Sequence, residues 1–158
     1  MASETVIVRA ESRYTLDDIF KAMSSSGRAG GGAIQIFDPG SVISRMHLEA
    51  AYLNSLVAFK NKANRTRSAG MEMLLFASMT NQIGEAIKIC GAKSNKDFIL
   101  FASNRTAFSR ISKLLSKSSD FKPSKQHIKG VAERYGIKVS RDIDSFMLQK
   151  IAVSRLDD

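Results

Sequence analysis

Four basic side chains fall within eight consecutive residues of the sequence, and no acidic residue lies among them. They are Lys60, Lys62, Arg65 and Arg67. Three polar side chains are interleaved with them, namely Asn61, Asn64 and Thr66. Such a segment supplies positive charge and hydrogen-bond donors together, and phosphate groups bind both. The pattern therefore favours a binding site for the phosphates of a nucleic acid.

The chain as a whole is also basic. Its 158 residues carry 24 Lys and Arg against 15 Asp and Glu, a formal net charge of +9. This excess favours a polyanionic partner, nucleic acid first and an anionic membrane second, although a soluble protein can be basic without either. A second basic group comprises Arg105, Arg110, Lys113, Lys117, Lys122, Lys125 and Lys129. We expect Arg110, Lys113 and Lys117 to share one helix face, and a solvated charged surface explains this group equally well.

Residues that could catalyse a reaction or bind a metal are few. His47 and His127 are the only histidines, and no group of Cys and His has the spacing of metal ligands. Cys90 follows an apolar helical pattern with nothing near it in sequence to stabilise a thiolate. Glu72 and Glu85 each lie beside a predicted helix start, which explains them without acid–base chemistry. We therefore expect no enzyme activity, no cofactor and no metal.

The cysteine count and the hydropathy pattern bear on the compartment. One cysteine allows no intrachain disulfide, which fits a reducing environment. The first residues contain no apolar run typical of a signal peptide, and no stretch approaches the roughly 18 apolar residues of a membrane span. These features predict a cytoplasmic protein.

Short strands and helices alternate along the chain and must position the basic residues. Runs of β-branched and aromatic residues predict strands over 5–10, 33–37 and 97–103. Caps and apolar periodicity predict helices over 16–24, 42–62, 71–79, 104–117, 126–135 and 142–155, with another between Thr80 and Gly91. The absence of a long linker predicts one mixed α/β domain over 1–158.

Two of these helices carry more apolar surface than one core contact needs. The helix over 42–62 has two stripes, Ile43, Met46, Ala50, Leu53 and Val57 on one side and Leu48, Tyr52, Leu56 and Phe59 on the other. We expect burial on both sides. The last helix is apolar nearly all round, with Ile143, Met147 and Ile151 on one side and Leu148, Ala152 and Leu156 on another. It is either enclosed within the monomer or offers a face to a partner.

Three polar residues separate two apolar helices, namely Thr80, Asn81 and Gln82. We expect Thr80 to cap the second helix. Asn81 and Gln82 would then lie at a helix N-terminus beside the basic segment, where an amide can read a nucleotide. Simple capping of the helix ends is the open alternative.

The segment from Asn64 to Ala92, "NRTRSAGMEMLLFASMTNQIGEAIKICGA", resembles the signature of the small regulatory subunit of the KEOPS complex, the family of the PRPK-binding protein. The matching residues are Arg65, Thr66, Arg67, Glu72, Gln82, Ile83, Glu85, Ala86 and Gly91. "IQIFDPGSVISRMHLEAA", "AERYGI" and "FMLQKIAVSRL" resemble the family's preceding and closing segments. The lack of long extensions is similar to archaeal members.

The resemblance implies a mixed α/β (α+β) fold with a small antiparallel-type sheet flanked by helices, and no catalytic activity. It implies binding to the small atypical kinase/ATPase subunit of KEOPS, which contacts the threonylcarbamoyl-transferring subunit. It also implies a role in holding the single-stranded 3′ CCA end of tRNA during synthesis of threonylcarbamoyladenosine (t6A).

Together with the residue patterns, this resemblance assigns two groups of site residues. The expected tRNA-binding residues are Lys60, Lys62, Arg65, Arg67, Asn81 and Gln82. The expected kinase-binding residues are Leu148, Ala152 and Leu156, with Ile143, Met147 and Ile151 facing the core. A stand-alone RNA-binding protein and a purely structural adaptor of a kinase are the alternatives.

Overall fold

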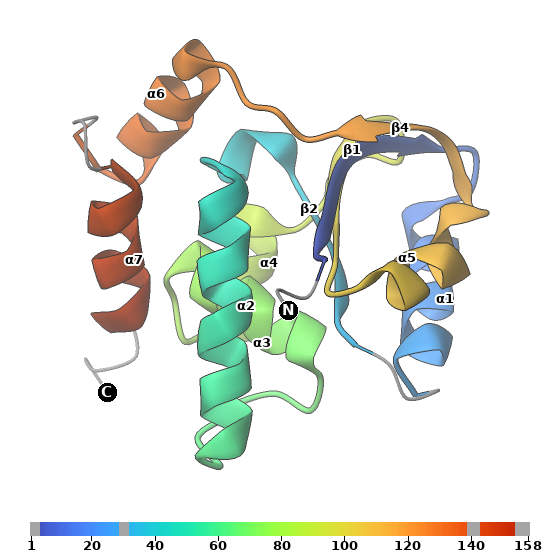
Figure 1. Cartoon of the computed structure of the whole chain (residues 1–158), viewed down its shortest axis with the longest axis horizontal. Coiled ribbons are helices and arrows are strands. Elements are labelled where there is room, and N and C mark those ends of the chain that lie inside the picture. The colour runs from blue at the N-terminus through green and yellow to red at the C-terminus, as the bar shows by residue number, and fades with distance from the viewer. Residues whose placement is uncertain (1–3, 29–31, 139–142, 154–158) are drawn as a thin grey trace.

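A four-stranded antiparallel sheet forms the centre of the protein (Figure 1). The computed structural model describes residues 4–28, 32–138 and 143–153. The strands are β1 (Val6–Ser12), β2 (Ile34–Phe37), β3 (Phe98–Ala102) and β4 (Leu115–Asp120), in the order β2-β3-β1-β4. Val8 lies opposite Leu100 in β3, and Arg9 lies opposite Ser119 in β4. The expected antiparallel sheet flanked by helices is confirmed.

Helices cover both faces of this sheet (Figure 1). Helices α1 (Leu16–Arg28) and α5 (Arg105–Ser112) lie on one face. The other side holds the 3-10 turn η1 (Pro39–Ser41), α2 (Arg45–Lys60), α3 (Ala69–Ser78), α4 (Ile83–Cys90), α6 (Lys125–Arg134) and α7 (Ile143–Val153). Because successive strand side chains point to opposite faces, Ile7 joins the core beneath α2 and α3, and Val8 joins the core beneath α1 and α5.

Short polar side chains define where the helices begin. Ser44 Oγ accepts a hydrogen bond from His47 N at the start of α2, and Ser68 Oγ accepts one from Met71 N at the start of α3. Asn104 accepts one from Ala107 N, as its position in the sequence predicts. Each cap satisfies a backbone N–H that has no partner inside the helix.

The prediction of a helix over 104–117 is wrong for the second half of that range. Helix α5 ends at Ser112, and Leu115–Asp120 form strand β4 against β1. The predicted shared helix face of Arg110, Lys113 and Lys117 therefore does not exist, because Lys117 lies in a strand. Pairing with the free edge of β1 decides this segment, whose Ser and Lys residues have little intrinsic strand preference.

The expectation that α2 is buried on both sides is also wrong. Leu48, Ala50 and Ala51 are buried, but Leu53 and Val57 are 60% and 55% exposed. Leu56 and Met46 are exposed as well. The sequence showed two apolar stripes, and the fold covers only one side of the helix with neighbours.

Candidate functional site

The four clustered cations all lie at the end of α2 and in the loop that leads to α3. Helix α2 closes with hydrogen bonds from Lys62 N to Phe59 O (3.2 Å) and from Ala63 N to Ala58 O (2.8 Å). Lys62 adopts a φ of 56°, and this left-handed residue turns the chain out of the helix. Lys60, Lys62, Arg65 and Arg67 are all exposed. The sequence cluster is therefore also a cluster on the surface.

A buried carboxylate holds this loop from beneath. Glu72, in the first turn of α3, is fully buried. Its oxygens accept hydrogen bonds from Arg65 N (3.0 Å and 3.2 Å), Thr66 N (3.0 Å) and the Thr66 hydroxyl (2.9 Å). Burying a carboxylate is unfavourable unless such donors surround it. Glu72 thus fixes the backbone from which Arg65 and Arg67 project.

Three of the four clustered cations carry charge that a ligand can neutralise. Among the described residues, Lys60, Lys62 and Arg67 form no ion pair. The negative charge of Glu72 is directed at backbone N–H groups of the loop. The outward surface of the loop therefore presents positive charge that a polyanion can neutralise.

Thr80, Asn81 and Gln82 lie at the opposite end of α3 from the basic loop. Ten residues at about 1.5 Å each make α3 about 15 Å long, so the structure separates the two groups that were expected side by side. The cap of α4 is Gln82 rather than Thr80, whose hydroxyl accepts a hydrogen bond from Gln82 N (3.3 Å). The Gln82 side chain is exposed and makes no capping hydrogen bond.

Apolar side chains follow Gln82 on the first turns of α4. Ile83 and Ile87 are 44% and 51% exposed, while Ala86 and Cys90 are buried. An exposed amide can hydrogen-bond the edge of an unstacked base. A strand of a few nucleotides, rather than one nucleotide, would be needed to reach from Gln82 to the basic loop.

Helix α7 lies alongside α2 (Figure 1). Ile151 is fully buried and Ile143 packs against the core, as expected for the inner side. Leu148 and Ala152 are exposed. The Met147 side chain and Leu156 lie outside the described residues. Leu53, Leu56 and Val57 of α2 add further exposed apolar surface, which the sequence reasoning had placed in the core.

Three buried titratable side chains of the core, His47, Cys90 and Tyr135, are held in their neutral forms. His47 Nδ1 accepts from Ile43 N (3.0 Å), so Nε2 carries the proton and donates to Ala77 O (2.8 Å). Burial lowers the pKa of His47 to about 4. Burial also raises the pKa of the Cys90 thiol to about 11 and raises that of the Tyr135 hydroxyl, which lies 3.2 Å from Cys90 Sγ. Cys90 is therefore a neutral core thiol.

The described ranges hold neither a metal-binding cluster nor a membrane-spanning helix. No group of three or more His, Cys, Asp or Glu residues there could hold a metal ion. No helix of that part is long and apolar enough to cross a membrane. The exposed features include a basic loop, an amide beside isoleucines, and the apolar faces of α2 and α7.

The family model for kinase binding protein CGI-121 matches residues 20–154, from within α1 to the end of α7. The chain belongs to the CGI-121 family. A search of curated proteins found no match. The family match confirms the resemblance given by the segment from Asn64 to Ala92, and it covers both the basic loop and α7.

In this CGI-121 family member, sequence reasoning missed two parts of the candidate site. It interpreted Glu72 as a charge beside a helix cap, although its offset of four residues from the Ser68 cap lets it reach back to the loop. It also placed Leu53 and Val57 in the core. The repeated apolar stripe was the available signal for a second contact surface on α2.

Proposed function

We propose that this CGI-121 family protein is a non-catalytic KEOPS subunit that binds the small kinase/ATPase subunit and recruits tRNA through its 3′ CCA end for t6A synthesis. The proposed binding to the kinase rests on one observation, the membership of this chain in a kinase-binding family. The tRNA half is supported by the exposed basic loop and the exposed Gln82 amide.

The proposed kinase-binding surface comprises the outer face of α7 and the adjoining exposed face of α2. Leu148 and Ala152 of α7 face outward while their neighbour Ile151 is buried. Leu53, Leu56 and Val57 extend the apolar surface along α2. Exposed apolar surface on two neighbouring helices favours a protein partner, because leaving it in water forgoes about 25 cal/mol per Å².

The proposed tRNA site uses both ends of α3. Lys60, Lys62, Arg65 and Arg67 bind phosphates of the single-stranded end, and the Gln82 amide binds a base edge, with Asn81 beside it. The separation of about 15 Å across α3 suits the several nucleotides of a CCA end and its neighbour better than a single base.

Two binding measurements test the proposal. The first mixes the purified chain with the purified KEOPS kinase subunit and measures complex formation by gel filtration. The second compares its affinity for tRNA with and without the CCA end, using wild type and Gln82→Ala. We expect a stable complex with the kinase, and a preference for intact tRNA that the variant loses. Binding to tRNA without any kinase complex would instead identify a stand-alone RNA-binding protein, and kinase binding without tRNA affinity at low salt would identify a structural adaptor.

A further inference from the structure

Strand β4 is the outermost strand of the sheet and is exposed on both faces. It pairs with β1 on one side, and its other side ends the strand order. Five of its six residues are exposed, and only Leu115 is half-buried. No further strand of the described chain pairs with its outer edge. β4 is therefore held by backbone pairing with β1 rather than by burial of its side chains.

The direction of the backbone groups along β4 follows from one hydrogen bond. Phe121 N donates to Ile7 O (3.0 Å), so the N–H of Phe121 points toward β1. N–H directions alternate along a strand, so Ser119 also points toward β1, whereas Ser118 and Asp120 point outward. These outward N–H and C=O groups have no partner among the described residues. They form the pattern that an additional strand needs.

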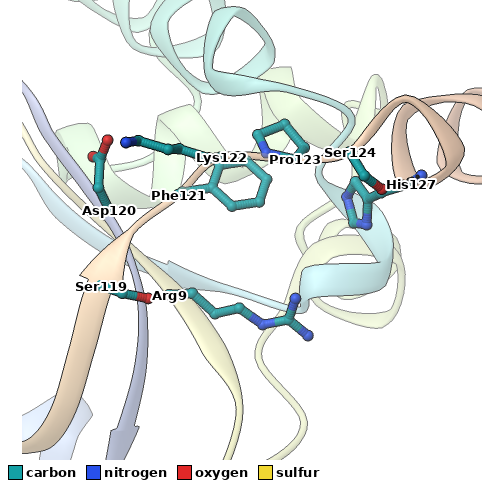
Figure 2. A pocket seen from close by; sticks show the side chains of 8 residues that line it. All are labelled: Arg9, Ser119, Asp120, Phe121, Lys122, Pro123, Ser124 and His127. Atoms are coloured by element: carbon teal, nitrogen blue, oxygen red, sulfur yellow. Dashed lines mark hydrogen bonds between the residues drawn. The ribbon is translucent and has the colours of Figure 1, made fainter.

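Hollows lie beside this edge on more than one side. One of about 680 Å³ is lined by Arg9, Lys96 and Lys117, among others, and another of about 600 Å³ is lined by Val8, Phe108 and Ser118, among others. A third, of about 330 Å³, continues past the end of β4 (Figure 2). Figure 2 shows the Arg9 side chain extending beneath Phe121 toward His127. An added strand directs alternate side chains to opposite faces, and these hollows offer room for them.

Charge around the edge favours an acidic occupant. Lys96, Lys117 and Lys122 line the hollows, and within the described residues they form no ion pair. Two nearby acids are already engaged, since Asp97 pairs with Arg9 (2.8 Å) and Asp120 with Arg45 (2.8 Å). Glu11 also lines the larger hollow and lies opposite Lys117 in the β1–β4 register. Three lysines against this one glutamate leave the net charge along β4 positive.

We propose that the outer edge of β4 binds an extended acidic segment of a partner protein, which pairs with Ser118 and Asp120 as an additional strand. Main-chain hydrogen bonds supply the affinity, and Lys96, Lys117 and Lys122 select acidic side chains. A second copy of this chain would set these lysines against one another, which disfavours pairing between copies. A nucleic acid would satisfy the lysines but leaves the paired N–H and C=O pattern unused. The site is independent of both α7 and the basic loop.

A synthetic peptide tests the proposal on the full chain. The probe is a short acetylated peptide of alternating threonine and glutamate, and its matched control is the same peptide N-methylated on every residue. We expect saturating probe to slow amide hydrogen exchange at Ser118 and Asp120, with little change at Ser119, whose N–H already points to β1. The N-methylated control, which cannot pair as a strand, should leave exchange unchanged. Equal binding of both peptides, or no protection at Ser118 and Asp120, would overturn the proposal.

Two variants separate the hydrogen bonds from the charge. Ser118→Pro removes an outward N–H, which an edge strand tolerates, and should weaken probe binding about tenfold with an unchanged Tm. Should this variant fail to fold, the N-methylated peptide tests the same hydrogen bonds without altering the protein. Lys117→Gln with Lys122→Gln should weaken binding and reduce its salt dependence. Tighter binding of an oligouridylate with the same lysine dependence, or concentration-dependent dimerisation that Ser118→Pro abolishes, would refute the acidic strand.

Discussion

Glu72 in α3 accepts hydrogen bonds from both the backbone N–H and the hydroxyl of Thr66, six residues earlier in the preceding loop. The same carboxylate also accepts from Arg65 N. One buried side chain therefore couples the start of a core helix to the loop that carries the clustered cations. Loop and helix should be disturbed together when this carboxylate is changed.

Glu72→Gln keeps the size of the side chain and removes its charge. The amide NH2 group would face backbone N–H groups, so at least one buried donor would lose its partner. We expect the free energy of unfolding to fall by about 1–3 kcal/mol, measured by urea titration. Glu85→Gln is the matched control, because Glu85 is exposed and forms an exposed ion pair with Lys88 (3.5 Å), a kind of contact that contributes little to stability. This variant should change the free energy of unfolding by less than about 0.5 kcal/mol. Equal effects of the two variants would contradict the role assigned to Glu72.

Charge reversal in the basic loop should weaken tRNA binding in a salt-dependent way. Lys60→Glu with Arg67→Glu leaves two phosphates without a cation, and log affinity should fall less steeply with log salt by about 0.7 for each such phosphate on a single strand. Lys125→Glu with Lys129→Glu on α6 is the control, since it lowers the net charge of +9 by the same four units. Filter binding across a salt series measures both. A similar decrease in affinity for the control pair would show that only the overall charge matters.

Adjacent residues of α7 should respond differently to substitution. Ile151→Ala leaves a cavity in the core and should cost about 2–5 kcal/mol of folding stability. Ala152→Arg places its charge on the exposed side, so the Tm should stay near wild type. In the complex the same arginine would be buried unpaired, so kinase binding should be strongly weakened.

The control for Ala152→Arg lies on the other layer of helices. Ser109→Arg adds the same side chain to exposed α5 and should leave kinase binding unchanged. Calorimetric titration with the kinase subunit, together with Tm, measures all three variants. Normal binding by Ala152→Arg would remove this face of α7 from the interface, and a much lower Tm would place Ala152 in the core.

Stability should decline in mild acid because of His47. Its pKa in the folded protein is lowered to about 4 by burial, while an unfolded histidine titrates near 6.5. Below pH 6.5 the unfolded chain therefore binds a proton that the folded chain does not, and stability falls as pH decreases from about 6.5 to about 4. The full loss is on the order of 3 kcal/mol.

His47→Gln isolates this contribution. A glutamine can accept from Ile43 N and donate to Ala77 O without titrating, so this part of the slope of stability against pH should disappear. His127→Gln, at the half-buried histidine of α6, is the control. Urea unfolding at several pH values gives the slopes. An unchanged slope in His47→Gln would show that another group governs the acid sensitivity.

Several parts of this protein follow from local sequence alone. The runs of β-branched and aromatic residues at β1, β2 and β3 are found as strands, because such residues pack well on a largely buried sheet. Asn104 caps α5, and Gly136 follows α6 with a φ of 70°, because caps depend on the chemistry of a few neighbouring residues. The clustered cations lie close together on the surface because they are close together in the sequence.

Tertiary structure alone decided the remaining features. Leu115–Asp120 become β4 because β1 offers a free edge, and no pattern in a Ser- and Lys-rich segment reveals that edge. Leu53 and Leu48 are equally apolar in sequence, but only the arrangement of the sheet, α3 and α7 around α2 determines that one is exposed and the other buried. Glu72 binds Thr66 because the loop folds back over the start of α3, and the sequence specifies the donor and the acceptor without specifying that return. Long-range packing supplies each of these relationships, and local propensity carries no information about which surfaces meet.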